Sequence, residues 1–335
     1  MSVSADGLSP AFKKVGWHRV TLTHTSTGTA MSSPIEATSK TLKPLRGVRV
    51  LSLALNLPGP AALMRLKAMG ATCLKAEPPG PKGAPDGTSG DPMGQYNPQA
   101  YATMHSGIKV LSIDLKTDKG QAALHKELAR TDLLITSFRP SALVKLSLGW
   151  KALHKAYPAL SVVAIVGAPG ARAEEPGHDL TYLADAGLVT GLELPATLFA
   201  DMGGALMTSE AALKAVLVQK TSGKGSFQEV ALSDAAAWLG LPRHWGLTQP
   251  KGAVGGAHAG YRVYPCKDGR VAVAALEPHF AAALCSAASV PITGMATLFQ
   301  PATHAAIAAF LAGQTRKQLD KLAAAKDIPL HTLAG

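Results

Sequence analysis

Residues 45–77 read LRGVRVLSLALNLPGPAALMRLKAMGATCLKAE, and this stretch predicts a strand, a helix and a second strand. Residues 48–53 are an apolar run of strand length. Residues 60–69 have the spacing of a helix and end before Gly70, a residue typical of the position that follows a helix. Residues 72–76 form the second strand. Because a helix separates the two strands, they are expected to lie parallel in one sheet.

The alternation of strands and helices continues along the chain. Further strands are predicted at residues 110–113, 133–136 and 160–166, and further helices at residues 120–129 and from Asp201 to Gln219. This order predicts an α/β domain with a Rossmann-like parallel sheet that is covered by helices on both faces. Residues 78–98 are rich in Gly and Pro and are predicted to be a loop.

The last part of the chain predicts a smaller α+β domain. Two strands with a turn at Lys267-Asp268-Gly269 are expected within residues 260–273, and helices over 278–289 and 301–325. A strand at 226–232 and a helix around 234–240 come before them. The predicted organisation is a disordered or mis-called extension over 1–42, a large α/β domain over 43–225, a linker over 226–259 and a small domain over 260–335. Met31 is an alternative start to Met1, because the preceding residues show no periodicity.

The composition narrows the classes of partner. The formal net charge is +11, but the basic residues are dispersed and aromatic residues make up only 5%, so nucleic acid is not expected as a partner. The excess positive charge suits an acidic nucleotide ligand. No apolar run of about twenty residues is present, so no membrane span is expected. Cys73, Cys266 and Cys285 are too few and too scattered for a disulfide framework or a metal site, which favours the cytoplasm.

Three acid/base residues lie in short sequence motifs, here called phrases, that are far apart in the sequence. His178 lies in PGHDLTYL, Asp201 in ADMGGA and Glu277 in ALEPHF. Taken alone, each has a structural explanation: Asp201 and Glu277 are suited to capping helices, and His178 to a turn. Proton transfer is the functional alternative, because histidine and carboxyl groups are the usual general acids and bases.

The wording and order of these phrases resemble those of the family III CoA-transferases, which include formyl-CoA and carnitine CoA-transferases and the 2-methylacyl-CoA racemases. Residues 45–52, Phe138-Arg139-Pro140 and 328–330 resemble further family phrases, so the likeness covers roughly residues 43–334. The retained His178 and Glu277 are closest to the racemase branch. The resemblance implies the family III fold, an interlocked homodimer and a coenzyme A (CoA) thioester as substrate, without a permanently bound cofactor.

The resemblance also implies roles for single residues. In a racemase-like reaction, His178 and Asp201 are two bases on opposite faces of the carbon next to the thioester carbonyl, and Glu277 accepts a hydrogen bond from the histidine. In a CoA-transferase, Asp201 is instead the nucleophile and becomes an aspartyl-CoA thioester. Neither route needs a metal. The residues expected to hold the CoA thioester are Arg139, Lys109, Pro60, Gly203 and Gly204, the two glycines through accessible N–H groups.

Several positions depart from the family phrases. Residues 105–109 keep only Lys109 of a basic run that usually helps to hold CoA. Residues 254–258 read VGGAH where racemases carry Leu-Asp-Gly-Gly-Ala-Pro. The sequence ends soon after Leu330, where the resemblance leads us to expect a return segment to the large domain. A catalytically inactive acyl-CoA-binding protein is therefore a third hypothesis, and no sequence feature identifies the acyl group.

Overall fold

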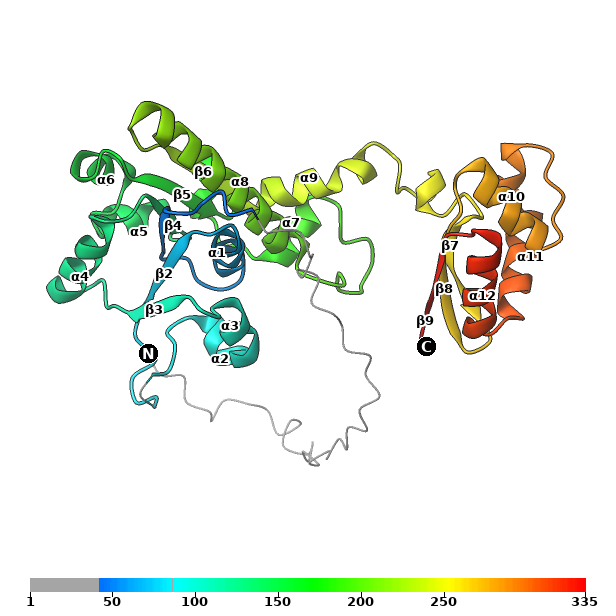
Figure 1. Ribbon diagram of the computed structural model, residues 1–335, viewed down its shortest axis with the longest axis horizontal. Coiled ribbons are helices and arrows are strands. Elements are labelled where there is room, and N and C mark those ends of the chain that lie inside the picture. The colour runs from blue at the N-terminus through cyan, green and yellow to red at the C-terminus, as the bar shows by residue number, and fades with distance from the viewer. Residues whose placement is uncertain (1–41, 86) are drawn as a thin grey trace, which may run out of the picture. The chain divides into compact units, whose positions relative to one another are not determined.

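The computed structural model describes residues 42–85 and 87–335 (Figure 1). Its main feature is a six-stranded sheet with the order β3-β2-β1-β4-β5-β6, in which every neighbouring pair is parallel. The predicted parallel sheet is confirmed. The predicted extension over 1–42 lies outside the described residues, apart from Leu42. The strands are β1 (Arg49–Ser52), β2 (Thr72–Glu77), β3 (Lys109–Ser112), β4 (Leu133–Thr136), β5 (Ser161–Val166) and β6 (Phe227–Ala231).

Helices cover both faces of this sheet. On β4, Leu133 and Ile135 point into one hydrophobic core and Leu134 points into another, as expected for side chains that alternate along a strand. The first core is closed by α1 (Pro58–Ala68) and α8 (Phe199–Ser222). The second is closed by α4 (Asp118–Leu128), α5 (Pro140–Lys145) and α6 (Trp150–Ala156). The result is a three-layer α/β/α arrangement.

The strand order creates a switch point between β1 and β4. From β1 the chain runs outward to β2 and β3, and it then returns to place β4 on the other side of β1. The connections that leave the carboxyl ends of β1 and β4 therefore diverge, which opens a crevice at this edge of the sheet. In open α/β sheets such a crevice is the usual ligand site.

Two segments differ from the sequence-based expectation. β6 pairs with residues 162–166 of β5, and α9 (Leu232–His244) follows it directly, so the predicted linker 226–259 supplies part of the α/β region. The predicted loop 78–98 contains α2 (Pro92–Tyr96) and the start of α3 (Pro98–Met104). Both short helices begin with a proline, and the side chains of Asp91 and Asn97 accept backbone N–H bonds at their N-termini.

The C-terminal region has an antiparallel sheet with the order β7-β8-β9. The predicted hairpin is confirmed, whereas β9 was not predicted. The predicted helix 301–325 is interrupted at Gly313, and the Thr315 hydroxyl caps the second part by accepting the Gln318 N–H. The elements are β7 (Tyr261–Cys266), β8 (Gly269–Ala274), α10 (Pro278–Ala287), α11 (Pro301–Ala312), α12 (Arg316–Lys326) and β9 (Leu330–Leu333).

Candidate active site

A cavity of about 200 Å³ opens at the carboxyl ends of β1, β4 and β5. Leu55 and Asn56 reach it from the loop after β1, residues 137–139 from the loop after β4, and Gly167 from the end of β5. The cavity thus lies at the switch point of the sheet, where the fold alone predicts a ligand.

Asp201 reaches the cavity from the first turn of α8. From the sequence, its side chain is suited to capping this helix, but Leu198 holds the N-cap position and no side chain caps there. The backbone N–H of Asp201 donates instead to Oδ1 of Asp179, over 3.0 Å. Asp179 is buried and begins α7 (Asp179–Asp185), so this bond ties the two helix N-termini together. Among the described residues, the Asp201 carboxyl group makes no hydrogen bond of its own, and Asp201 lines the cavity.

Burial changes the acidity of Asp201. Desolvation raises the pKa of its carboxyl group to about 6, the nearby Asp179 carboxylate acts in the same direction, and His178 opposes the rise. An ordinary aspartate is fully ionised at neutral pH, whereas this group, with its higher pKa, keeps a minor protonated fraction there. A carboxyl group with such a pKa can both accept and return a proton near neutrality.

His178 lines the same cavity as Asp201. It is exposed and holds the N-cap position of α7. Its backbone N–H donates to the Thr181 hydroxyl oxygen over 3.1 Å, and its carbonyl accepts the Thr181 hydroxyl over 2.7 Å. These two bonds fix the backbone from which the imidazole projects. The structure therefore brings together two of the three predicted acid/base residues.

Glu277 does not join them within the described residues of this chain. It is exposed, precedes Pro278 at the N-terminus of α10, and its side chain makes no cap hydrogen bond. It does not line the cavity. No hydrogen bond between Glu277 and His178 occurs among residues 42–85 and 87–335. The pairing expected from the resemblance stays a prediction.

The residues predicted to hold CoA fall into two groups. Arg139 lines the cavity, is exposed, and forms no ion pair within the part of the chain that the structure describes. Lys109 is the first residue of β3. It therefore lies at the amino ends of the parallel strands, whereas the cavity lies at their carboxyl ends. Pro60 is buried in the first turn of α1 and does not line the cavity, whereas Pro58 does.

Gly203 and Gly204 serve the packing of two helices. A Cβ atom on Gly203 would lie 3.1 Å from Leu239 and 3.3 Å from Ala235, and one on Gly204 would overlap Leu232. Both glycines are buried inside α8, where N–H groups bond to carbonyls one turn earlier. The expectation that their N–H groups are accessible to a ligand is not met. Their small size lets α9 approach α8 closely.

Sequence reasoning missed Asn56 and Tyr182, which also line the cavity. Asn56 has a positive φ of 61°, and its N–H donates to Oδ1 of Asp91 over 3.0 Å. Tyr182 follows His178 by four residues, a spacing that places two side chains on one face of a helix. That spacing was the available signal for Tyr182, whereas nothing in the sequence marked Asn56.

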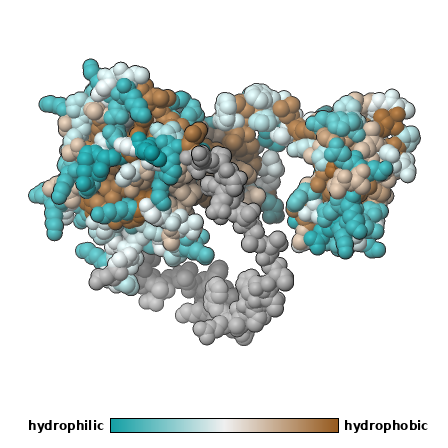
Figure 2. Space-filling model, viewed as in Figure 1, coloured by the Kyte–Doolittle hydropathy of each residue, from teal (hydrophilic) through white to brown (hydrophobic). Residues whose placement is uncertain are grey.

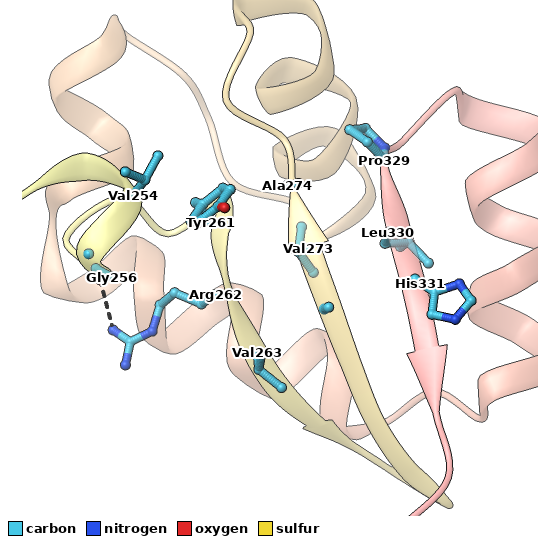
Figure 3. Close-up of a pocket in the computed structure, with 12 residues that line it drawn as sticks. Val254, Gly256, Tyr261, Arg262, Val263, Val273, Ala274, Pro329, Leu330 and His331 are labelled. Carbon is cyan, nitrogen blue, oxygen red and sulfur yellow. Dashed lines mark hydrogen bonds between the residues drawn. The ribbon is translucent and has the colours of Figure 1, made fainter. Parts of the chain in front are cut away.

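A second hollow, of about 700 Å³, lies on one face of the three-stranded sheet (Figure 3). Its lining is largely apolar, with Val254, Val263 and Leu330 among the contributors. Arg262 donates a hydrogen bond of 3.2 Å to the carbonyl of Gly256 at its rim. None of the predicted site residues lines this hollow. It lacks the paired acid and base that distinguish the cavity at the switch point.

Two further observations concern the described residues alone. No group of three or more His, Cys, Asp or Glu side chains is placed to hold a metal ion in this part of the chain. Among its helices, none combines the length and the hydrophobicity that crossing a bilayer requires.

The fold and the cavity define a class: an α/β protein with a doubly wound sheet and, at its switch point, a cavity lined by an acid and a base. The model of CoA-transferase family III matches residues 45–334. The chain belongs to CoA-transferase family III, as the sequence phrases had suggested.

The relatives of this chain include proteins named as racemases and proteins named as transferases. The alpha-methylacyl-CoA racemase of Mus musculus is 30% identical over 258 residues, which are 72% of this chain and 63% of the racemase. A "Probable fatty acyl-CoA transferase" of Mycobacterium tuberculosis is 30% identical over 60% of this chain and 54% of its own length. The chain thus spans between half and two thirds of these relatives. A solved structure of a hypothetical protein from Mycobacterium tuberculosis shares the fold, with a TM-score of 0.74, 24% identity, and coverage of 89% of this chain and 85% of that chain.

Proposed function

We propose that the protein processes acyl-CoA thioesters and exchanges the proton on the carbon next to the thioester carbonyl, as a 2-methylacyl-CoA racemase or epimerase does. The observation that carries this proposal is the meeting of His178 and Asp201 in one cavity at the switch point. Similarity to a racemase over 72% of this chain supports it.

The proposed reaction consists of two proton transfers. A thioester acidifies the adjacent carbon, and His178 removes the proton from one face to leave an enolate. Asp201, in its protonated form, then returns a proton to the opposite face. Its pKa of about 6 suits this role, because both protonation states are populated near neutral pH. In the reverse direction the two residues exchange roles.

Arg139 is the proposed contact for a CoA phosphate. Arg139 is exposed and lines the cavity, and an arginine guanidinium group matches the geometry of phosphate oxygens with two parallel hydrogen bonds. Lys109 is not part of this proposal, because it lies at the amino end of its strand, away from the cavity at the carboxyl ends. Calorimetry should therefore show CoA binding that weakens when Arg139 is replaced by alanine.

Proton exchange in heavy water tests the reaction. Incubation with a panel of 2-methylacyl-CoA thioesters is expected to place deuterium at the 2-position. Asp201→Ala and His178→Ala should each slow this exchange by ~10²–10⁴-fold, the usual contribution of a general acid or base. His244→Ala, at an exposed histidine near the end of α9, is the matched control and should leave the rate unchanged. Absence of exchange with every thioester would contradict the racemase proposal.

CoA transfer is the second candidate, because the relatives also include CoA-transferases. In this reaction the Asp201 carboxylate attacks the thioester carbonyl and expels the CoA thiolate, leaving an anhydride. The thiolate then attacks the aspartyl carbonyl, which releases the free acid and leaves an aspartyl-CoA thioester. Hydroxylamine would convert either intermediate into a hydroxamate at Asp201. Mass spectrometry should find Asp201 unmodified if the racemase proposal holds. CoA binding without either reaction would favour an inactive acyl-CoA-binding protein.

We also propose that the chain forms a homodimer. Phe199, Met202 and Leu206 share one exposed face of α8, and α9 exposes Trp238 to 70% of its full area. Figure 2 shows hydrophobic residues reaching the molecular surface in the face displayed. Large exposed apolar side chains of this kind are typical of surfaces that are covered in an assembly. A second copy of the chain is the occupant that the family resemblance implies.

A further inference from the structure

Tyr182 places a hydroxyl group at the wall of the cavity. It lies on α7, and its ring is partly buried against the core that α1 and α8 close. The hydroxyl lies between Gly167 and Gly177, which line the cavity with it. A Cβ atom on either glycine would overlap the hydroxyl or the ring carbon that carries it. The absence of side chains at these two positions therefore makes room for the Tyr182 hydroxyl.

This hydroxyl has no hydrogen-bond partner in the described part of the chain. Other tyrosine hydroxyls do find partners there: Tyr101 donates to Glu77, Tyr264 donates to the carbonyl of Ala259, and Tyr157 bonds to His125. A partly buried phenol usually has such a partner, because losing its contact with water is costly. At Tyr182, space for a partner exists on the cavity side.

Burial, together with the Asp201 carboxylate, keeps the pKa of this phenol above its ordinary value, so the phenol is protonated at neutral pH. Burial raises the pKa of Tyr182, the Asp201 carboxylate raises it further, and the Arg139 guanidinium acts in the opposite direction. A protonated phenol can donate a hydrogen bond. Tyr182 lines the same cavity as Asp201, His178 and Arg139.

We propose that the Tyr182 hydroxyl donates a hydrogen bond to the carbonyl oxygen of the bound thioester. This inference rests on the proposed function. When the proton leaves the adjacent carbon, its bonding electrons form the carbon–carbon double bond of the enolate, and the carbonyl electron pair moves to the oxygen. Tyr182 stabilises that negative charge and keeps its own proton. When the proton returns to carbon, the carbonyl double bond forms again.

The first test compares rates of deuterium exchange. Tyr182→Phe should lower kcat by ~10²–10³-fold, the usual effect of removing one donor to an oxyanion, and change KM by less than about threefold. Tyr157→Phe is the control, because it removes a hydroxyl that bonds to His125 and does not line the cavity. Gly167→Ala keeps the Tyr182 hydroxyl but displaces it, so this variant should also be slow. It can replace Tyr182→Phe if that variant does not fold.

The second test reports on the carbonyl itself. Cinnamoyl-CoA has a conjugated thioester whose absorption band moves to longer wavelength when its carbonyl oxygen accepts a hydrogen bond. We expect this shift on binding to the wild-type protein and to Tyr157→Phe, and a smaller shift on binding to Tyr182→Phe at similar affinity. An equal shift in Tyr182→Phe would overturn the role of Tyr182 and leave the proposed function intact. Failure of the wild-type protein to bind cinnamoyl-CoA or any other CoA thioester would overturn both.

Discussion

Burial gives the Asp201 carboxyl group a pKa that suits proton transfer and, at the same time, makes it a cost to folding. Its pKa rises from the ordinary 3.8 to about 6, because the cavity wall removes water and the Asp179 carboxylate repels its charge. The ionised form that is present at neutral pH is therefore less stable in the folded chain than in the unfolded one. Reactive sites often carry such a cost.

Asp201→Asn should stabilise the protein in a pH-dependent way. Because the folded-state pKa of Asp201 lies above its ordinary value, the folded chain binds more protons between pH 3.8 and about 6, and the wild-type free energy of unfolding falls as pH rises through this interval. Asparagine does not titrate. The difference in free energy of unfolding between the variant and the wild type should therefore grow from pH 4 to pH 7, by at most about 3 kcal/mol in favour of the variant.

Urea unfolding at pH 4, 5, 6 and 7 measures this difference. Asp185→Asn, at the exposed end of α7, is the control and should show no comparable gain. A difference between Asp201→Asn and the wild type that stays constant over this pH range would show that the folded-state pKa is not raised.

The sequence identified part of the site at the level of single residues. His178 and Asp201 could be found from the sequence because each lies in a short motif that resembles a motif of the family. Tyr182 could not be assigned a role, because that role depends on the space left by Gly167 and Gly177. Asn56 is recognised by its place in the cavity lining, its positive φ and its bond to Asp91, which is 35 residues away in the chain.

Among the structural elements, the loop from β1 to α1 depends on a buried group of charges. Asp91 is fully buried and accepts the N–H groups of Asn56 and Met93, each over 3.0 Å. Its other oxygen pairs with Lys75, which is also fully buried and lies 3.0 Å from Glu77. The Asp91 carboxylate therefore connects β2 and α2 to the loop that carries Asn56 into the cavity. Its loss would leave the Lys75 charge poorly compensated.

Asp91→Ala is expected to destabilise the fold by about 3–5 kcal/mol, the usual effect of removing one partner from a buried ion pair. Denaturant unfolding measures this loss. Glu210→Ala is the control: it breaks an exposed pair with Lys214 on α8 and should cost less than about 0.5 kcal/mol. Equal losses for Asp91→Ala and Glu210→Ala would contradict this account.

The strands of the sheet were predictable and the short helices were not. β4 and β5 are buried along their whole length, so apart from one polar residue at an end, each is an apolar run that is visible in the sequence. α2 and α3 have five and seven residues, which is too short for a helical pattern to emerge, and their Gly- and Pro-rich surroundings favoured a loop. β9 was missed because four residues near the end of a chain form a strand only where β8 provides a partner.

At the scale of the whole molecule, the position of Glu277 points to an assembly of two chains. The resemblance pairs it with His178, but Glu277 does not line the cavity, and its exposed carboxylate caps no helix. A homodimer resolves this difference if each cavity receives Glu277 of the partner subunit. The exposed apolar residues of α8 and α9 offer surface for such an assembly. Equilibrium sedimentation should then report twice the chain mass of 34.5 kDa.

Heterodimers of two inactive variants test this arrangement directly. One chain would carry Asp201→Ala and the other Glu277→Gln, and co-expression with two different affinity tags would isolate dimers that contain one of each. If Glu277 acts across the dimer, one of the two cavities combines His178, Asp201 and an intact Glu277, and about half of the wild-type exchange rate should return. If Glu277 acts within its own chain, both cavities are damaged and no activity should return. Homodimers of each variant, purified in the same way, give the baseline. A stable, active monomer would remove the basis for both the dimer and the shared site.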